Sequence, residues 1–136
     1  MRVDLHSHSS VSDGLDSPAE LVRHMAYAGV KAMALTDHDT LQGLPEAREE
    51  AEKLGIELIA GAEISADFAG QDDIHILALF VDESSAALNG RLVERRENRR
   101  KRCERMAQKL IKAGYKLDLK AIRKDVGDGV WGRPHL

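Results

Sequence analysis

Short apolar runs of strand length alternate with longer amphipathic runs through the first part of the chain, and this order limits the possible folds more than any other feature. The strand-like runs cover residues 2–8, 31–36, 56–64 and 74–81. The helical patterns between them run from Ser17 to Gly29 and from Leu44 to Leu54. A strand–helix–strand order predicts an α/β fold, a largely parallel sheet or barrel with helices outside.

Local signals at the ends of these runs support the same order. Ser17, Pro18 and Glu20 form a capping box with proline in the first helical turn, and Gly55 closes the second helix. The connection over residues 65–73 is too short for a crossover helix. We therefore expect an antiparallel hairpin there, with Gly70 near its turn.

Beyond Ser84 the pattern becomes helical as far as Ala113, with a candidate break at Asn89-Gly90. A short helix over 119–126 follows, between Asp118 and Gly127. The change of pattern predicts two parts: a barrel portion over residues 1–83 with four strands and two helices, and a helical segment over residues 84–136.

Charge is unevenly distributed along the chain. Residues 1–90 contain 5 Lys or Arg and 17 Asp or Glu, whereas residues 91–136 contain 15 and 6. An acidic N-terminal part and a basic C-terminal part suit a site that holds cations and attracts an anion. A pair of solvated helices is the simpler explanation of this charge distribution. For the basic run from Arg91 to Arg105 we favour a solvated helix with one or two arginines facing the site.

Composition excludes several classes of protein. A hydrophobic content of 43% with 32% charged residues is typical of globular domains rather than disordered ones. The start of the chain lacks the apolar core of a signal peptide, and the longest apolar run, residues 76–81, is too short to span a membrane. We expect a cytoplasmic protein. The single cysteine, Cys103, excludes an internal disulfide and any multi-cysteine zinc site.

Histidines and carboxylates stand at one end of all four predicted strands. His6 and His8 close the first strand and Asp13 follows it, Asp37 and His38 close the second, Glu63 closes the third, and His75 opens the fourth. On the second strand Ala32, Ala34 and Thr36 share a face with His38 and leave room above them. Parallel α/β folds build their sites at the carboxyl ends of strands, and the hairpin brings His75 beside Glu63.

Each of these residues also has a structural reading on its own. A lone pair of histidines often ends a strand, Asp13 before Gly14 is a common turn, and Asp39 or Thr40 could cap the second helix. The joint pattern at four strands instead favours a divalent metal. Imidazole and carboxylate without thiolate suit Zn²⁺, Mn²⁺ or Fe²⁺, and Mg²⁺ less well.

The segments DLHSHSSVSDG, ALTDHDT, GAEIS and IHILALF resemble, in order, the motifs of the polymerase and histidinol phosphatase (PHP) domain family of metal-dependent phosphoesterases. The resemblance implies a distorted (βα)7 barrel with a cluster of two or three metals. By the same resemblance the metal ligands are His6, His8, Asp13, His38, Glu63 and His75, with Glu63 as the bridge. Asp37 beside His38 is expected to orient an imidazole and to belong, with His38, to the catalytic centre.

The C-terminal part of the chain resembles one subgroup of this family. RRENRRKRCERMAQKLIKAG followed by GRPHL is similar to the helical insertion of a bacterial subgroup that acts on nucleoside 3′,5′-bisphosphates and on the 5′ end of short RNA. It implies that Arg133 and His135 contact a substrate phosphate; the simpler alternative is that Pro134 opens a helix. Trp131 could stack on a base, but packing is the favoured role.

We therefore expect hydrolysis of a phosphate monoester by a metal-activated hydroxide. The substrate is a phosphorylated nucleotide or short RNA, with histidinol phosphate as the weaker option. The resemblance implies one further histidine and an Asp-x-His pair, which we expect a longer chain or a partner to supply. Two rivals are an amidohydrolase barrel, which would need a bridging lysine, and a non-catalytic, metal-stabilised scaffold.

Overall fold

The computed structural model describes residues 1–68, 71–127, 129–132 and 135–136. Within these residues the elements follow one another as β1 (Arg2–Ser7), α1 (Pro18–Tyr27), β2 (Val30–Leu35), α2 (Leu44–Leu54), β3 (Glu57–Phe68), β4 (Gln71–Leu79), α3 (Ala86–Lys112) and α4 (Leu119–Val126). The predicted order of strands and helices is confirmed, and α2 and α4 have the predicted bounds.

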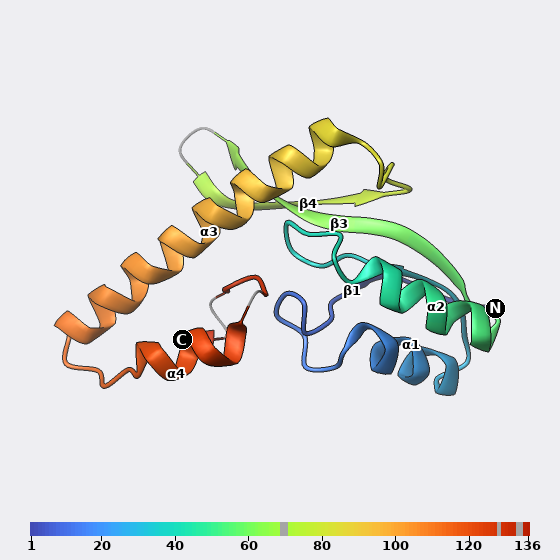
Figure 1. Cartoon of the computed structure of the whole chain (residues 1–136), viewed down its shortest axis with the longest axis horizontal. Coiled ribbons are helices and arrows are strands. Elements are labelled where there is room, and N and C mark those ends of the chain that lie inside the picture. Colours follow the sequence, from blue (N-terminus) through green and yellow to red (C-terminus); the bar gives the residue numbers. More distant parts are fainter. Residues whose placement is uncertain (69–70, 128, 133–134) are drawn as a thin grey trace.

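The four strands form one curled sheet in the order β1-β2-β3-β4. β1 pairs with β2, and β2 with β3, in parallel, while β3 and β4 are antiparallel. The helices α1 and α2 lie side by side on one face of this sheet (Figure 1). This is the arrangement expected for part of a parallel barrel with outer helices.

Local sequence explains where α1 and α2 begin and end. The Ser17 hydroxyl accepts the Glu20 backbone N–H and the Glu20 carboxylate accepts the Ser17 N–H, so the predicted capping box is present. Gly55 adopts a φ of 67° and ends α2. The apolar faces of both helices pack on the sheet, and the core contains Val22, Val30, Met33, Leu35, Leu44, Ala47, Ala51 and Ile56.

The opposite face of β2 is lined by small residues, and this face carries the site. Ala34 and Thr36 are fully buried there, next to Gly61 of β3. A Cβ on Gly61 would lie 2.9 Å from Thr36 Cγ2 and 3.0 Å from the Ala78 carbonyl oxygen, so a larger residue would not fit. The close approach holds β2 and β3 together immediately below Glu63.

The β3–β4 hairpin is antiparallel, as predicted, but longer than expected. Pairing continues through Ser65↔His75 and Ala66↔Ile74 to Phe68↔Gln71, so most of the predicted connection is strand. Gly70, which we placed near the turn, lies outside the described residues. The backbone hydrogen bonds between β3 and β4 continue beyond the alternating apolar residues from which the strand ends were predicted.

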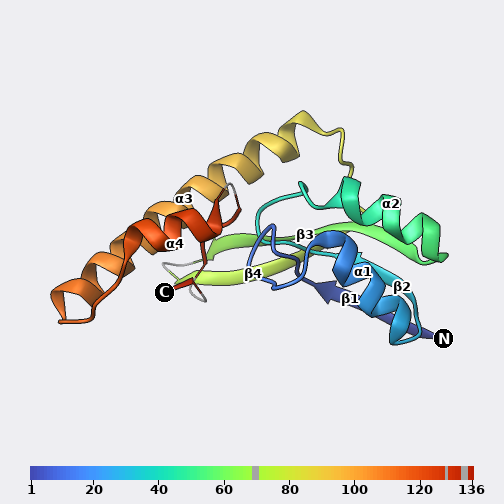
Figure 2. The same ribbon diagram turned by 60° about the horizontal axis from the view of Figure 1, so that its bottom comes forward.

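The helix α3 is continuous, so the candidate break at Asn89-Gly90 is wrong. The Ser85 hydroxyl caps the helix by accepting the Leu88 N–H, and the Asn89 side chain donates to the carbonyls of Glu83 and Ser85. These bonds stabilise the first turns and offset the helix-weakening effect of Gly90. Figures 1 and 2 show α3 extending away from the sheet, with α4 folded back toward it.

None of the helices in the described part of the chain combines the length and the hydropathy needed to cross a membrane. The predicted division of the chain near residue 83 stays a prediction.

Candidate metal centre

Glu63 is the centre of the candidate site. It lies in β3, is 6% exposed, and faces the rim formed by the ends of β1 and β2. Its backbone N–H donates to the carbonyls of Thr36 and Asp37, and its own carbonyl accepts the Asp39 N–H. The pairing of β2 with β3 therefore continues past the end of β2 and sets His38 directly beside Glu63.

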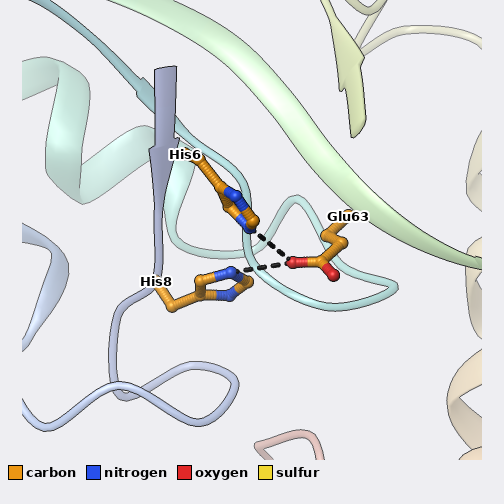
Figure 3. Close-up of side chains that lie close together, drawn as sticks. All are labelled: His6, His8 and Glu63. Atoms are coloured by element: carbon orange, nitrogen blue, oxygen red, sulfur yellow. Dashed lines mark hydrogen bonds and ion pairs between the residues drawn. The ribbon is translucent and has the colours of Figure 1, made fainter. Parts of the chain in front are cut away.

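Three imidazoles contact the Glu63 carboxylate directly. His6 Nε2 and His8 Nε2 lie 2.8 and 2.9 Å from Oε2, while His75 Nδ1 lies 2.6 Å from Oε1. Figure 3 shows the rings of His6 and His8 turned toward the same carboxylate oxygen from the end of β1. The alternation of side chains along β1 brings these two rings to one face, as the sequence predicted.

A second carboxylate, Asp13, joins the cluster from the loop after β1. Its two oxygens lie 3.3 Å from His38 Nε2 and 3.5 Å from His8 Nδ1. His38 Nδ1 is 3.8 Å from Glu63 Oε2, so His38 stands between the two carboxylates. All six predicted metal ligands therefore lie in one cluster of imidazoles and carboxylates.

The spacing of these side chains fits divalent metal ions. Ligand atoms lie within 4.8 Å of one another in three sets: His6, His8 and Glu63; His8, Asp13 and His38; His38, Glu63 and His75. Two ligand atoms that are each about 2.1 Å from one ion are roughly 3–4 Å apart, so small side-chain movements suffice for coordination. Glu63, His8 and His38 each belong to two sets, so neighbouring sets share ligands, as in a site for more than one ion.

The electrostatics of the cluster favour charged carboxylates beside a neutral His8. A hydrogen bond with His38 lowers the pKa of Asp13 to about 2. Burial acts to raise the pKa of Glu63, but hydrogen bonds with His6 and His75 and the charge of His38 hold it below its usual value. Burial, followed by the charge of His38, lowers the pKa of His8. Charged carboxylates and neutral imidazoles are the forms that bind metals.

None of the described hydrogen bonds of Asp37 goes to an imidazole, and its expected role beside a ring stays a prediction. Its carboxylate accepts hydrogen bonds from the Ser9 backbone N–H at 2.7 Å, the Ser9 hydroxyl at 2.7 Å and the Ser12 hydroxyl at 2.6 Å. Ser12 Oγ in turn lies 3.4 Å from His8 Nδ1 and precedes Asp13. Asp37 therefore holds the loop that carries His8 and Asp13.

Asp39 anchors the other side of His38. It is fully buried with a φ of 53°, and its carboxylate accepts the Ser65 N–H, the Ser65 hydroxyl and the Arg99 Nε–H. The alternative role of Asp39 or Thr40 as the cap of α2 is wrong, because Gly43 is the N-cap.

Sequence reasoning missed Arg99 as an individual residue. It is 7% exposed and reaches across more than sixty positions of chain to donate to His38 Nδ1 at 3.2 Å. Its place on α3 held a usable signal, since it falls on the buried stripe formed by Leu92, Arg99, Cys103 and Ala107. Ser9, Ser12 and Ser65 carried no comparable signal, because isolated serines are common in loops and strands.

Of the two predicted phosphate-binding residues, His135 is described by the structure and has no described contact with the cluster. Arg133 lies outside the described residues. The described hydrogen bonds of His135 stay within its own turn, where Nδ1 accepts the Gly132 N–H at 3.0 Å. Trp131 is 5% exposed, and its carbonyl accepts the Cys103 thiol, which agrees with the packing role.

Known proteins resemble this chain over most of its length. The PHP domain family matches residues 4–115 of the chain. The 5′-3′ exoribonuclease of Haemophilus influenzae is 46% identical over 114 residues, which are 83% of this chain and 41% of that protein. The phosphoribosyl 1,2-cyclic phosphate 1,2-diphosphodiesterase of Eggerthella lenta is 39% identical over 117 residues, 85% of this chain and 45% of that protein.

A third relative, the 3′,5′-nucleoside bisphosphate phosphatase of Chromobacterium violaceum, is 38% identical over 112 residues, 82% of this chain and 39% of that protein. The chain thus spans less than half the length of each of these relatives. A solved structure described as an amidohydrolase from Chromobacterium violaceum with bound sulfate and no metal has a TM-score of 0.91 at 32% identity. It covers 99% of this chain and 48% of that one.

Proposed function

The chain belongs to the PHP domain family, and from this membership we propose that it forms the metal centre of a phosphoesterase. The observation that carries the proposal is the convergence of three imidazoles, two from the end of β1 and one from β4, on one buried carboxylate, that of Glu63. A structural ion pair would need one partner, whereas Glu63 contacts three rings and lies near a fourth. Such a concentration of metal-ligand types is typical of a catalytic metal cluster.

The proposed cofactor is a cluster of two or three divalent ions, Mn²⁺, Zn²⁺ or Fe²⁺ in preference to Mg²⁺. Such ions supply two effects: they lower the pKa of water and neutralise charge on phosphoryl oxygens. The residues of this chain hold the ions and fix their spacing. Glu63 would contact two ions, while the imidazoles and Asp13 complete their surroundings.

Positioning is the second task of the residues near the cluster. Asp37 holds the loop of His8 and Asp13, and Asp39 holds the segment after β2 against β3. Both carboxylates are buried, so these contacts are shielded from water. Rigid placement of this kind supports in-line displacement at phosphorus, where alignment of the reacting groups contributes much of the rate.

We propose a nucleoside 3′,5′-bisphosphate or the 5′ end of a short oligonucleotide as the substrate. The names of two relatives, a 3′,5′-nucleoside bisphosphate phosphatase and a 5′-3′ exoribonuclease, support this class. A third relative is named for a cyclic phosphodiester, so the assay must include one. Arg133 and His135 remain the predicted contacts to a substrate phosphate.

The test is release of inorganic phosphate or nucleotide by the purified protein, after chelation and after reloading with each metal in turn. The substrates are a nucleoside 3′,5′-bisphosphate, a nucleoside monophosphate, a 5′-phosphorylated RNA trimer, histidinol phosphate and a cyclic phosphodiester. We expect metal-dependent hydrolysis, with the bisphosphate or the trimer preferred.

Two variants make the result specific to the site. Glu63→Gln should abolish the metal-dependent activity, while the exposed Glu52→Gln on α2 should leave it unchanged. If the protein binds metal but hydrolyses none of the five substrates, it is a metal-stabilised scaffold and the proposal fails.

A further inference from the structure

The segment Gly129–Trp131, which follows α4, contacts the loop between β1 and α1 that carries His8 and Asp13. We call residues 8–14 the ligand loop. The Val130 backbone N–H donates to the carbonyl of Val11, in the middle of this loop, at 3.0 Å. Figures 1 and 2 show the chain after α4 beside the loop that follows β1. A backbone contact therefore joins the helical part of the chain to the ligand loop.

Gly129 permits this contact because it has no Cβ. A Cβ there would lie 2.9 Å from the Val126 carbonyl oxygen, 3.3 Å from that of Val11 and 3.5 Å from that of Ser10. These neighbours are backbone atoms, which cannot turn aside as the end of a flexible side chain can. Glycine is the residue that allows so close a backbone approach. An alanine at this position would push the segment away from the ligand loop.

The ligand loop is a tight turn, so a shift in its middle must reach Asp13. The backbone N–H groups of Ser12 and Gly14 both donate to the Ser9 carbonyl, at 3.0 and 2.9 Å. Gly14 passes so near the backbone of His8 that a Cβ would lie 2.3 Å from the His8 carbonyl oxygen. A loop closed by these contacts moves as one unit. Displacement where the segment touches it would therefore also displace the Asp13 carboxylate.

The segment is also fixed to α3. Val130 and Trp131 are buried, and the Trp131 carbonyl accepts the thiol of Cys103, which is 1% exposed, at 3.3 Å. Among its described residues, the core packed by α1 and α2 contains none of these three. The segment Gly129–Trp131 therefore connects α3 to the ligand loop by a packing region separate from that core.

We propose that the segment Gly129–Trp131 is a positioning element of the metal centre: packed between α3 and the ligand loop, it holds Asp13 where this carboxylate can ligate a metal ion. Asp37 holds the same loop through other residues. The inference rests on the proposed function in one respect, since it takes Asp13 as a metal ligand. It gives α3 and α4 a role in metal binding, because these helices carry the segment.

The first experiment is titration of Mn²⁺ into the chelator-treated wild type, Gly129→Ala and Gly90→Ala, with unbound Mn²⁺ measured by electron paramagnetic resonance. Gly129→Ala should weaken Mn²⁺ binding by about 10-fold, the lower end of the range for residues that hold metal ligands in place. Gly90 lies in open space on α3. Gly90→Ala is therefore the matched control, and it should bind Mn²⁺ as tightly as the wild type.

A double variant separates positioning from a general loss of structure. If Gly129 acts through Asp13, Gly129→Ala should change the Mn²⁺ affinity by less than about threefold in the Asp13→Asn background. The two ligand sets without Asp13 remain to bind the ion in that background. A purely structural role predicts the same loss in both backgrounds, and that result would overturn the inference.

The thiol of Cys103 gives a readout that leaves the contact itself unaltered. It is the only cysteine, and it is bonded to the docked segment, so a thiol reagent reaches it only after opening. Because coupling between two equilibria is reciprocal, saturating Mn²⁺ should slow this labelling by about 10-fold in the wild type. The effect should disappear in Asp13→Asn. Equal slowing in both proteins would mean that the metal acts on the whole fold, and the inference would fail.

Trp131→Ala replaces Gly129→Ala if the latter does not fold. It removes the buried side chain that fixes the segment and leaves the core packed by α1 and α2 intact. The same loss of about 10-fold in Mn²⁺ affinity is expected. Wild-type Mn²⁺ affinity in these variants would overturn the inference.

Neither the Mn²⁺ titration nor the labelling of Cys103 requires turnover. Absence of hydrolysis together with a Mn²⁺ affinity that depends on Gly129 would remove the proposed catalysis alone. Hydrolysis without that dependence would remove this inference alone.

Discussion

The carboxylate of Asp37 offers a direct way to test how the loop carrying His8 and Asp13 is held. Asp37 is 1% exposed and accepts three hydrogen bonds of 2.6–2.7 Å from Ser9 and Ser12. Asp37→Asn keeps the shape of the side chain and removes its charge. The amide oxygen can replace Oδ1, which accepts two of the bonds, while the amide nitrogen faces the Ser9 hydroxyl, which can rotate to accept.

The expected change in the free energy of unfolding follows from these three hydrogen bonds. A hydrogen bond to a charged group contributes about 1.5–3 kcal/mol and a neutral one about 0.5–1.5 kcal/mol, so the loss is about 1 kcal/mol per bond. Burial raises the pKa of Asp37, which shows that placing the charge here has a cost that asparagine avoids. We therefore expect Asp37→Asn to lower the free energy of unfolding of the metal-free protein by about 1–2 kcal/mol. Asp37→Ala leaves three donors without an acceptor and should cost about 3 kcal/mol or more.

Metal affinity should fall as well, by about 10- to 100-fold for Asp37→Asn, because residues that hold metal ligands in place contribute on this scale. Urea unfolding followed by circular dichroism measures the stability of the chelated protein, and competition with a chromophoric chelator measures the metal affinity. Asp16→Asn is the control, since the bond of Asp16 to His24 is exposed and its loss should change stability by less than about 1 kcal/mol. If Asp37→Asn unfolds at the wild-type urea concentration and binds metal as tightly, Asp37 does not hold this loop.

Four further predictions concern the cluster, its support and α3. Glu63→Gln should reduce the bound metal per chain, measured by elemental analysis, more than His75→Ala does, because Glu63 belongs to two ligand sets; equal losses would contradict a bridging role. Gly61→Ala should lower the free energy of unfolding by about 1–3 kcal/mol, since its Cβ would lie 2.9 Å from Thr36 Cγ2. Gly90→Ala, in open space on α3, should instead be neutral or slightly stabilising by thermal unfolding, and a loss there would show that α3 needs the glycine. Chelation should lower the melting temperature, with a loss of about 2.7 kcal/mol expected from metal present at a hundred times its dissociation constant; an unchanged melting temperature would argue against bound metal.

Much of the fold could be read from the sequence because its determinants are local. The capping box at Ser17, the glycine that ends α2 and the apolar periodicity of each run act within a few residues. The antiparallel hairpin followed from the length of its connection. The errors fell where a backbone ladder or a side-chain cap outweighs the local pattern, as in the longer β3 and β4 and the unbroken α3.

The edge at which the six candidate ligands lie could also be predicted, because parallel strands bring their carboxyl ends together and the hairpin brings His75 beside Glu63; the ligand set itself came from the family resemblance and stays a prediction. That rule places histidine and carboxylate side chains together once the strand order is known. It says nothing about the residues that hold them. Asp37, expected beside a ring, binds the Ser9–Ser12 loop.

Arg99 shows what only the tertiary structure decides. The basic run of α3 has the composition of a solvated helix, and although Arg99 shares a stripe with Leu92, Cys103 and Ala107, periodicity does not say which acceptors it meets. This depends on how α3 crosses the sheet, which sets Arg99 against Asp39, Ser65 and His38 from segments 34 to 61 positions away. A buried guanidinium is stable only where such distant acceptors meet it. The sequence by itself thus determined the strands and the sheet edge at which the candidate ligands lie, because these depend on short-range patterns. Long-range packing decided that Arg99 is the arginine beside them.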